Sequence, residues 1–468
     1  MSGVDKKLNH DSSVQKRMMK EYASGVLPTL SKFEFITTDE NIRDDDEDAP
    51  LYKFPLKKIV ISDQSKIVDG IEVEYMCKMS APNFKSDDAR NFHNYTPSCN
   101  IFNSQSIEKD EKLSSVEEIY VFVPGNPGNC LIYHEFLERL CERLDNQEEE
   151  KNRLVIAVSL RGHSYYYPSQ FWQGLTLFKS NSSSSSLYHS LEAYNLNDQV
   201  DYFTLIVQKL HRQFPNAKLI LQGHSVGCFL ISKVMERLNV CKKKSHHPIV
   251  QPLTQTIVDN AVDKLIFFYP TVQNMHSETP NGQSLLQYAI KAPLRVYLAN
   301  LLYNLASPIL PTFVIRLSRR SSPILVPWIP YYVDSMRIIK NVTTLASHEF
   351  EEILDSFGND SSQNTFKDAM RDHKDKLRVI FSTADLWVPR KHVLSFLDHV
   401  FDVNSYEGKT ILELENSTVV DEQEFCKILD KACLNVGISN QVTFSHTTQH
   451  AFVIHQDNLE ITSKLPLR

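Results

Sequence analysis

The sequence predicts an α/β fold in which helices cover both faces of a mostly parallel sheet. Three observations support this prediction. Short, continuous apolar runs recur along the chain, as expected for strands that are buried on both faces. Helical patterns separate these runs, and a serine between two glycines directly follows one of them. The chain has 468 residues, 42% of them hydrophobic, which is enough for one large core.

The predicted strands fall into two groups. Residues 57–62 and 70–79 alternate between apolar and polar side chains, which is typical of antiparallel strands. Five later runs are continuously apolar and predict parallel strands: 119–125, 153–159, 218–223, 264–270 and 377–383. Residues 130–144 and 195–213 have helical patterns. The chain order therefore predicts two antiparallel strands followed by a mostly parallel sheet.

Four segments are expected along the chain. Residues 1–50 form a loosely ordered extension that ends in an acidic run. Residues 51–283 and 346–468 form the two parts of the core, and residues 284–345 form an apolar cap between them. Residues 402–440 are expected to be an extended segment with one helix before the last strand. Three polar stretches are expected to be surface loops: 180–186, 241–255 and 355–375.

The apolar cap has two possible interpretations. Its uncharged stretch, residues 299–315, is near the lower length limit for a membrane-spanning helix, and prolines interrupt it. The cap either packs over the sheet or also exposes an apolar face to lipid. Aromatic and basic side chains of the cap fit an interfacial surface: Tyr297, Tyr303, Trp328, Tyr331, Tyr332, Arg316, Arg319 and Arg320.

The charge of the chain argues against one class of partner, and its cysteines indicate the compartment. The net charge of −7 argues against nucleic acid as the main partner, because phosphate binding needs a basic face. The eight cysteines show neither metal-ligand nor disulfide spacing, which indicates a reducing compartment. His246 and His247 are adjacent in a basic loop, where solvated side chains are more common than metal ligands. No metal and no cofactor are expected.

The stretch Gly223-His224-Ser225-Val226-Gly227 predicts a nucleophile elbow. A buried strand precedes it and an amphipathic helix follows it, which is the context that this sharp turn requires. Side chains at the two glycine positions would clash with the neighbouring strand and helix. Ser225 would then point out at the carboxyl edge of the sheet, beside N–H groups of a helix N-terminus. The alternative is an ordinary Gly-Ser turn between a strand and a helix.

A serine hydroxyl needs a base, and in this fold the acid and the histidine come later in the chain. Asp385 directly follows an apolar strand and is the favoured acid. His450 is the favoured base because it lies in the loop between the last strand and the closing helix, whereas His446 follows the strand directly and His455 falls on the helix. The rival acids have less suitable places: Asp198, Asp372 and Asp375.

Two backbone N–H groups are expected to form an oxyanion hole. One belongs to Val226, next to the predicted nucleophile. The other is expected from the turn after the strand at 119–125, which reads Pro-Gly-Asn-Pro-Gly-Asn over residues 124–129. By analogy with the His-Gly-x-Pro turn of many hydrolases, Asn126 is the predicted second donor. The alternative is a β-turn without a catalytic role.

With these residues, the chain resembles the lipid droplet-associated hydrolase family of α/β-hydrolases over about residues 115–460. The resemblance implies an α/β-hydrolase fold with a triad of Ser225, Asp385 and His450. It also implies that the apolar cap helps the protein to sit on lipid droplets or endoplasmic reticulum. Five motifs support it: "VPGNPGN" with the following Tyr133-x-x-Phe136, "GHSVG", "FFYPTVQNMHSETPNGQ", "ADLWVP" and "QHAFVIH".

The leading hypothesis is a serine esterase of lipase type that hydrolyses lipid esters through an acyl-enzyme. The family resemblance implies a sterol ester or an acylglycerol as substrate, and a lipid droplet location with a possible endoplasmic reticulum or cytosolic pool. The alternative is a protein with little catalytic activity that organises droplets through its apolar cap. A third hypothesis, a soluble esterase or acyltransferase for small metabolites, would require a closed cap.

Overall fold

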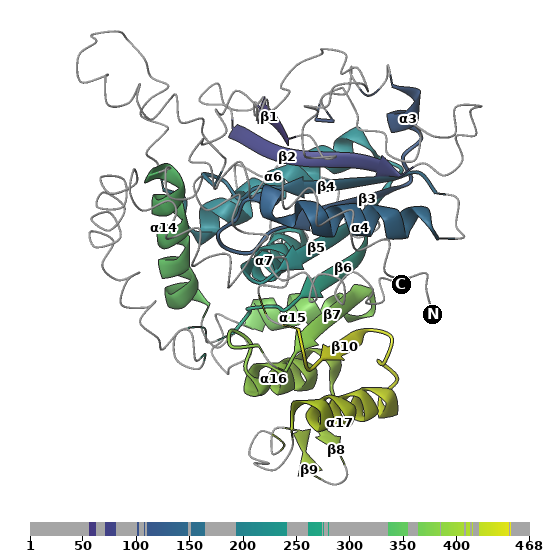
Figure 1. The fold of residues 1–468 in the computed structure, drawn as a ribbon, viewed down its shortest axis with the longest axis vertical. Helices are drawn as coiled ribbons and strands as arrows, with labels where there is room; N and C mark the ends of the chain where they lie inside the picture. The colour runs from purple at the N-terminus through teal and green to yellow at the C-terminus, as the bar shows by residue number, and fades with distance from the viewer. Residues whose placement is uncertain are drawn as a thin grey trace, which may run out of the picture.

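The structure is a computed structural model, and its described residues form one eight-stranded sheet with helices on both faces (Figure 1). The described stretches, several with short internal gaps, are 56–61, 71–80, 101–163, 193–240, 261–279, 336–353 and 364–450. Several predicted segments lie outside the described residues: the N-terminal extension 1–50, the loops 180–186 and 241–255, and the part of the cap before residue 336.

The strands begin and end close to their predicted positions. The first two, β1 (Leu56–Ile61) and β2 (Ile71–Ser80), pair antiparallel. The sheet order is β1-β2-β4-β3-β5-β6-β7-β10, and β2 is the one strand of these eight that runs in the opposite direction to the other seven. The predicted mostly parallel sheet is therefore confirmed. Its other strands are β3 (Glu118–Val123), β4 (Arg153–Val158), β5 (Lys218–His224), β6 (Val262–Phe268), β7 (Leu377–Ser382) and β10 (Val442–Ser445).

The centre of the sheet places three strand ends side by side. Val123 at the end of β3 pairs with Gly223 of β5, and Gly223 pairs with Phe267 of β6. The chain passes from β3 to β4 on one side and later places β5 on the other side of β3. This change of direction is a topological switch point, and in open α/β sheets ligands bind outside the carboxyl ends of the strands at such a point.

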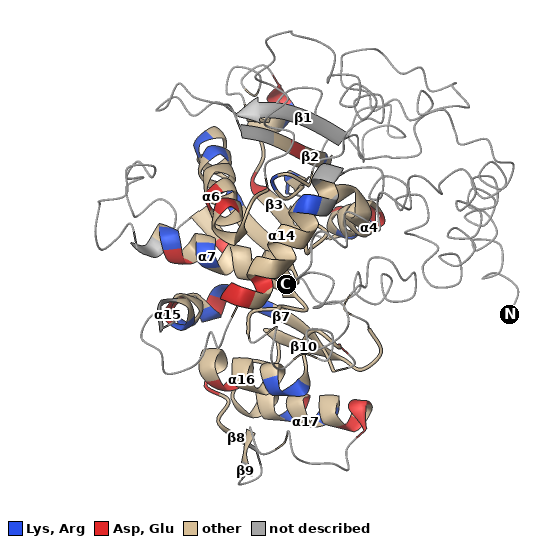
Figure 2. Ribbon diagram, turned by 90° about the vertical axis from the view of Figure 1, so that its left-hand side faces the viewer, with Lys and Arg blue, Asp and Glu red and all other residues tan. Residues whose placement is uncertain are grey.

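Helices cover the two faces of the sheet separately. Helix α4 (His134–Asp145), after the 3₁₀ turn η2 (Cys130–Tyr133), lies on one face. Helices α6 (Leu196–Gln213) and α7 (Val226–Val240) lie on the other face, as Figure 2 shows. These bounds confirm the helices predicted at 130–144 and 195–213. The burial of β3 along its whole length explains why its sequence is continuously apolar.

Residues 355–375 were predicted to be a surface loop, and this prediction is wrong. Helix α15 (Asn364–Asp372) occupies part of the segment. The missed signal is a short helical period, because Phe366, Ala369 and Met370 are buried while the residues between them are mostly polar. The ring of Phe366 stacks on Phe229 of α7, with 5.7 Å between ring centroids.

The remaining elements complete the carboxyl edge and the end of the molecule. Helix α14 (Met336–Glu352) stands beside the carboxyl ends of the parallel strands (Figures 1 and 2). Helix α17 (Glu422–Asn435) confirms the single helix predicted within 402–440. None of the helices in the described part of the chain is long and apolar enough to cross a membrane. The smaller or peripheral elements are α3 (Glu111–Ser114), η5 (Lys374–Lys376), α16 (Arg390–Phe401) and the hairpin of β8 (Ser405–Tyr406) and β9 (Lys409–Thr410).

Candidate active site

Ser225 lies in the sharp turn between strand β5 and helix α7. Its φ angle is 54°, in the left-handed region that residues with a side chain rarely adopt. The N–H of Ser225 donates to the carbonyl of Phe268 (3.0 Å), and the carbonyl of Ser225 accepts from the N–H of Cys228 (3.0 Å). These two hydrogen bonds hold the strained backbone in place. The turn therefore presents the side chain at the carboxyl edge of the sheet.

Two glycines leave the space that this turn needs. A Cβ on Gly223 would lie 2.7 Å from the backbone nitrogen of Cys228 in the following helix. A Cβ on Gly227 would meet the carbonyl oxygen of Val123 on the neighbouring strand β3. Both approaches involve backbone atoms, which cannot move aside as a flexible side chain can. Any larger residue at either position would push the elbow away from β3 or from its own helix.

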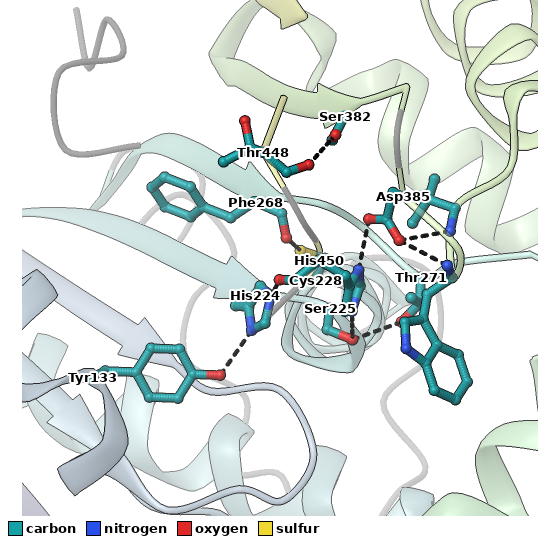
Figure 3. Close-up of polar contacts among 12 residues, drawn as sticks. Tyr133, His224, Ser225, Cys228, Phe268, Thr271, Ser382, Asp385, Thr448 and His450 are labelled. Atoms are coloured by element: carbon teal, nitrogen blue, oxygen red, sulfur yellow. Dashed lines mark hydrogen bonds and ion pairs between the residues drawn. The ribbon is translucent and has the colours of Figure 1, made fainter. Parts of the chain in front are cut away.

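His450 lies between Ser225 and Asp385 (Figure 3). Its Nε2 is 2.7 Å from Ser225 Oγ, and its Nδ1 is 2.7 Å from Asp385 Oδ2. Because a carboxylate can only accept, Nδ1 carries the proton and Nε2 is left to accept from the serine hydroxyl. The Asp385 side chain is 0% exposed and that of His450 is 13% exposed, so water competes little for these bonds. The three side chains that the sequence singled out therefore form one connected chain.

Asp385 is held in a fixed orientation by the backbone that follows it. Its second carboxylate oxygen, Oδ1, accepts hydrogen bonds from the N–H groups of Trp387 (2.7 Å) and Val388 (3.2 Å). Oδ2 is thereby aimed at His450.

The loop that presents His450 is tied to the end of strand β7. The hydroxyl of Ser382 donates to the carbonyl of Thr448, and the N–H of Thr448 donates to Ser445 Oγ (3.1 Å). The carbonyl of His450 lies 2.8 Å from His224 Nε2 in the elbow. The histidine is therefore positioned by contacts to the ends of three strands, β5, β7 and β10, as well as by its own side-chain bonds.

The rival candidates lie elsewhere. His446 is exposed directly after β10, and His455 is outside the described residues. Asp198 belongs to the capping box at the start of α6, where its carboxylate accepts from the N–H of Asn195 (2.9 Å). The remaining two rival acids are exposed and precede strand β7: Asp372 and Asp375.

The turn after strand β3 passes directly beside Ser225. A Cβ on Gly125 would lie 2.8 Å from Ser225 Cβ, and the turn is closed by a bond from the N–H of Gly128 to the carbonyl of Gly125 (2.7 Å). Asn126 follows Gly125, and Val226 follows Ser225, so both predicted oxyanion donors come from backbone next to this serine. Neither N–H has a hydrogen-bond acceptor within the part of the chain that the structure describes.

Three residues of the site were not predicted from the sequence. The hydroxyl of Thr271 lies 3.4 Å from Ser225 Oγ, and that of Tyr133 lies 2.7 Å from the elbow histidine. Glu349 of α14 accepts a hydrogen bond from the side-chain amide of Asn126 (3.0 Å). Tyr133 and Thr271 stand in motifs of the family resemblance, which was the available signal. Glu349 has no signal of its own, because it is one residue of an ordinary amphipathic helix.

Metal-ligating clusters are not found in the described residues, where no three His, Cys, Asp or Glu side chains are arranged to hold an ion. His246 and His247 lie outside those residues. Cys426 and Cys433 are buried in the core. No disulfide joins any of the described cysteines, and all six are buried: Cys77, Cys130, Cys141, Cys228, Cys426 and Cys433.

The sheet order, the elbow after β5 and the position of the acid after β7 define the class of this protein. It has the α/β-hydrolase fold, with a serine on the strained strand-to-helix turn and the histidine after the last described strand. Among solved structures, a peroxisomal alpha-beta-hydrolase from Saccharomyces cerevisiae is similar, with a TM-score of 0.43 and 10% sequence identity. The likeness covers 88% of this chain and 87% of that chain.

The chain belongs to the lipid droplet-associated hydrolase family. Residues 116–418, more than half of the chain, match the family model described as lipid-droplet associated hydrolase. A lipid droplet-associated hydrolase of Gallus gallus is 23% identical over 296 residues, which cover 62% of this chain and 76% of the relative. One of Mus musculus is 23% identical over 308 residues, which cover 63% of this chain and 77% of the relative.

Proposed function

We propose that this protein is a serine esterase of lipase type that hydrolyses lipid esters through an acyl-enzyme on Ser225. The main support is the position of His450, which is 2.7 Å from both Ser225 Oγ and Asp385 Oδ2. In this arrangement His450 is the general base and Asp385 holds its ring in the required tautomer.

The first half of the reaction forms the acyl-enzyme. The hydroxyl of Ser225 attacks the carbonyl carbon of the ester while its proton passes to His450 Nε2. The negative charge that develops on the carbonyl oxygen is stabilised by the N–H groups of Val226 and Asn126. When the tetrahedral intermediate collapses, the C–O bond to the alcohol breaks and His450 gives its proton to the leaving oxygen.

The second half of the reaction releases the acid. A water molecule gives a proton to His450 Nε2 and attacks the acyl carbon. The same two N–H groups stabilise the second oxyanion, and the proton returns to Ser225 as the ester bond to the enzyme breaks. The buried carboxylate of Asp385 stabilises the imidazolium in both halves, because it faces Nδ1 at hydrogen-bond distance.

The proposed substrates are sterol esters or acylglycerols at lipid droplets, with an additional pool at the endoplasmic reticulum or in the cytosol. Membership of the lipid droplet-associated hydrolase family and the names of the relatives support this substrate class and this location. The apolar segment 284–345 is the proposed contact with the droplet surface, because it combines a long apolar stretch with aromatic and basic side chains.

A fluorophosphonate probe tests the enzymatic part of the proposal. Purified wild-type protein should be labelled, and Ser225→Ala and His450→Ala should each abolish labelling because nucleophile and base are lost. His446→Ala is a matched control, since this histidine is exposed four residues away from His450. It should be labelled at the wild-type rate. A screen of sterol esters and acylglycerols with unlabelled wild-type protein would then identify the substrate.

A folded wild-type protein that is not labelled would contradict the esterase proposal. It would favour the alternative, in which the fold is a scaffold and the cap organises droplets. Flotation with artificial droplets of triacylglycerol covered by phospholipid measures the surface contact separately. Wild type and Ser225→Ala should float equally well, because the nucleophile is not part of the proposed contact. If neither floats, the proposed droplet contact is wrong.

A further inference from the structure

A chain of hydrogen bonds joins the proposed oxyanion turn to the backbone of His450. Figure 3 shows the part that runs from Tyr133 through His224 to His450. The N–H of Gly125 donates to the hydroxyl oxygen of Tyr133 (3.0 Å), and this oxygen lies 2.7 Å from His224 Nδ1. The other ring nitrogen of His224, Nε2, lies 2.8 Å from the carbonyl oxygen of His450. These hydrogen bonds therefore connect the turn after β3, through the elbow, to the loop after β10.

The carbonyl at one end of this chain and the neutral ring of His224 determine the direction of every bond in it. The N–H of Gly125 can only donate and the carbonyl of His450 can only accept. His224 therefore carries its proton on Nε2, and its Nδ1 accepts from the hydroxyl of Tyr133. The ring is neutral, because burial and the neighbouring His450 lower the pKa of His224 well below its usual value. Each group in the chain has the partner that it needs.

Tight packing holds the hydrogen-bonded groups in place. Tyr133 is 3% exposed and His224 is 4% exposed, and their rings meet edge-on with 5.7 Å between centroids. A Cβ on Gly125 would lie 2.9 Å from His224 Nδ1, so the turn already touches the ring. The rings of His224 and His450 are 5.1 Å apart. A shift of the oxyanion turn would therefore displace the base, and a shift of the base would displace the turn.

We propose that Tyr133 and His224 are positioning residues for the hydrolysis, which set the distance between the oxyanion donor of the turn and the general base. This role rests on the proposed function. Ester attack requires the base at Ser225 Oγ and the donors at the carbonyl oxygen at the same moment, and small misplacements of either are costly. The chain links both requirements through two rigid aromatic side chains.

The neutral ring of His224 also suits the reaction. During attack His450 takes up a proton and becomes positively charged. A second protonated ring 5.1 Å away would oppose that charge, whereas a neutral His224 supports His450 through a bond to its carbonyl. The position therefore needs a side chain that donates one hydrogen bond, accepts another and stays uncharged when buried.

Tyr133→Phe is the test, because it removes one hydroxyl and keeps the ring. The matched control is Tyr120→Phe, since Tyr120 is another buried tyrosine whose hydroxyl donates to Glu118 (3.3 Å) within strand β3, away from the site. We expect Tyr133→Phe to lower the second-order rate of fluorophosphonate labelling and kcat for p-nitrophenyl butyrate by about tenfold or more, with KM within about twofold of wild type. Tyr120→Phe should leave all three unchanged.

A pair of variants at His224 tests the other half of the chain. His224→Phe loses both bonds, whereas His224→Gln keeps an uncharged donor that can reach the carbonyl of His450. We expect the labelling rate of His224→Gln to lie between those of wild type and His224→Phe. This graded rescue would not arise if His224 only filled space, because phenylalanine fills it better than glutamine does.

The outcomes separate this role from the proposed function. If wild type is not labelled, the proposed function fails and the positioning role fails with it. If wild type is labelled but Tyr133→Phe and Tyr120→Phe react at equal rates, only the positioning role is overturned. If Tyr133→Phe does not fold, the comparison of His224→Gln with His224→Phe tests the positioning role. Equal rates for His224→Gln and His224→Phe would then overturn the role.

Discussion

The carboxyl group of Glu349 accepts a hydrogen bond from the side-chain amide of Asn126 at 3.0 Å, which ties helix α14 to the proposed oxyanion turn. The same amide also donates to the carbonyl of Val342 (3.1 Å). Glu349 is 4% exposed, and burial raises its pKa to about 8, with the hydrogen bond from Asn126 offsetting part of the rise. At neutral pH the turn is therefore held by an uncharged carboxylic acid.

Glu349→Gln should flatten the pH dependence of stability. In the unfolded chain this carboxyl ionises near 4.5, whereas in the folded protein it keeps its proton until about pH 8. The folded state therefore binds one more proton between these values. The free energy of unfolding should fall by about 1.4 kcal/mol per pH unit across this window in wild type, relative to Glu349→Gln. Urea denaturation at pH 5 and pH 7.5 measures the difference.

The control for this pH experiment is Glu135→Gln, which changes a partly exposed carboxylate paired with Arg139. It should keep the wild-type slope, because this side chain lies on the surface of helix α4 and not in a buried contact as Glu349 does. An equal pH slope in wild type and Glu349→Gln would show that Glu349 is ionised in the folded protein.

Asp385→Asn should lower kcat by a factor on the order of a thousand or more, with little change in KM. An amide can donate to His450 Nδ1 and so favours the wrong tautomer, in which Nε2 is protonated and cannot accept from Ser225. Kinetics with a soluble ester measure this loss, and circular dichroism checks folding. Asp375→Asn, at an exposed rival acid, should retain wild-type activity. Activity of Asp385→Asn within tenfold of wild type would argue for a different acid.

Gly227→Ala should destabilise the protein by at least about 2 kcal/mol, because the new Cβ would meet the carbonyl oxygen of Val123. Gly437→Ala provides a comparison at a glycine with a φ of 78° and no atom within 4 Å of its added Cβ. It should cost about 1 kcal/mol from backbone strain alone. Urea denaturation of both variants tests this order. Equal costs would mean that the elbow can relax away from β3.

Glu118→Gln should lower the free energy of unfolding by about 3–5 kcal/mol, because it removes the carboxylate that pairs with the fully buried Arg153 at 3.1 Å. Burial acts to raise the pKa of Glu118, but hydrogen bonds from Lys151 and Arg153 outweigh it and lower the pKa below 4.5. The stabilisation by Glu118 is therefore present above pH 4.5 and is lost as the pH falls through the lowered pKa.

Denaturation at pH 7 and pH 3.5 tests this prediction for Glu118→Gln. The difference in the free energy of unfolding between the variant and wild type should be smaller at the lower pH. Activity per folded molecule should stay unchanged, because Glu118 begins β3 at the edge of the sheet opposite to the site. The exposed-pair variant Glu135→Gln should cost less than about 1 kcal/mol. A cost that small for Glu118→Gln would mean that water reaches Arg153.

Much of the sheet could be predicted because parallel strands buried on both faces have continuously apolar sequences, as β3 and β4 do. The elbow was recognisable because its glycines are required by backbone contacts next to Ser225. Helix α15 was missed because its buried residues are few and stand among polar ones. The sequence alone favoured His450 but kept His446 as an alternative, since both follow strand β10.

By itself the sequence determined the order of strands and helices, the strained turn at Ser225 and the candidates for acid and base. Local patterns contain this information, because burial determines the spacing of apolar residues along a strand or helix and a sharp turn requires glycine. Only the tertiary structure decided that the loop bound to Ser382 brings His450 rather than His446 to the serine. It also decided that Asn126 meets Glu349 across more than two hundred residues. Hydrogen bonds between distant side chains depend on how the elements pack, and no local period encodes them.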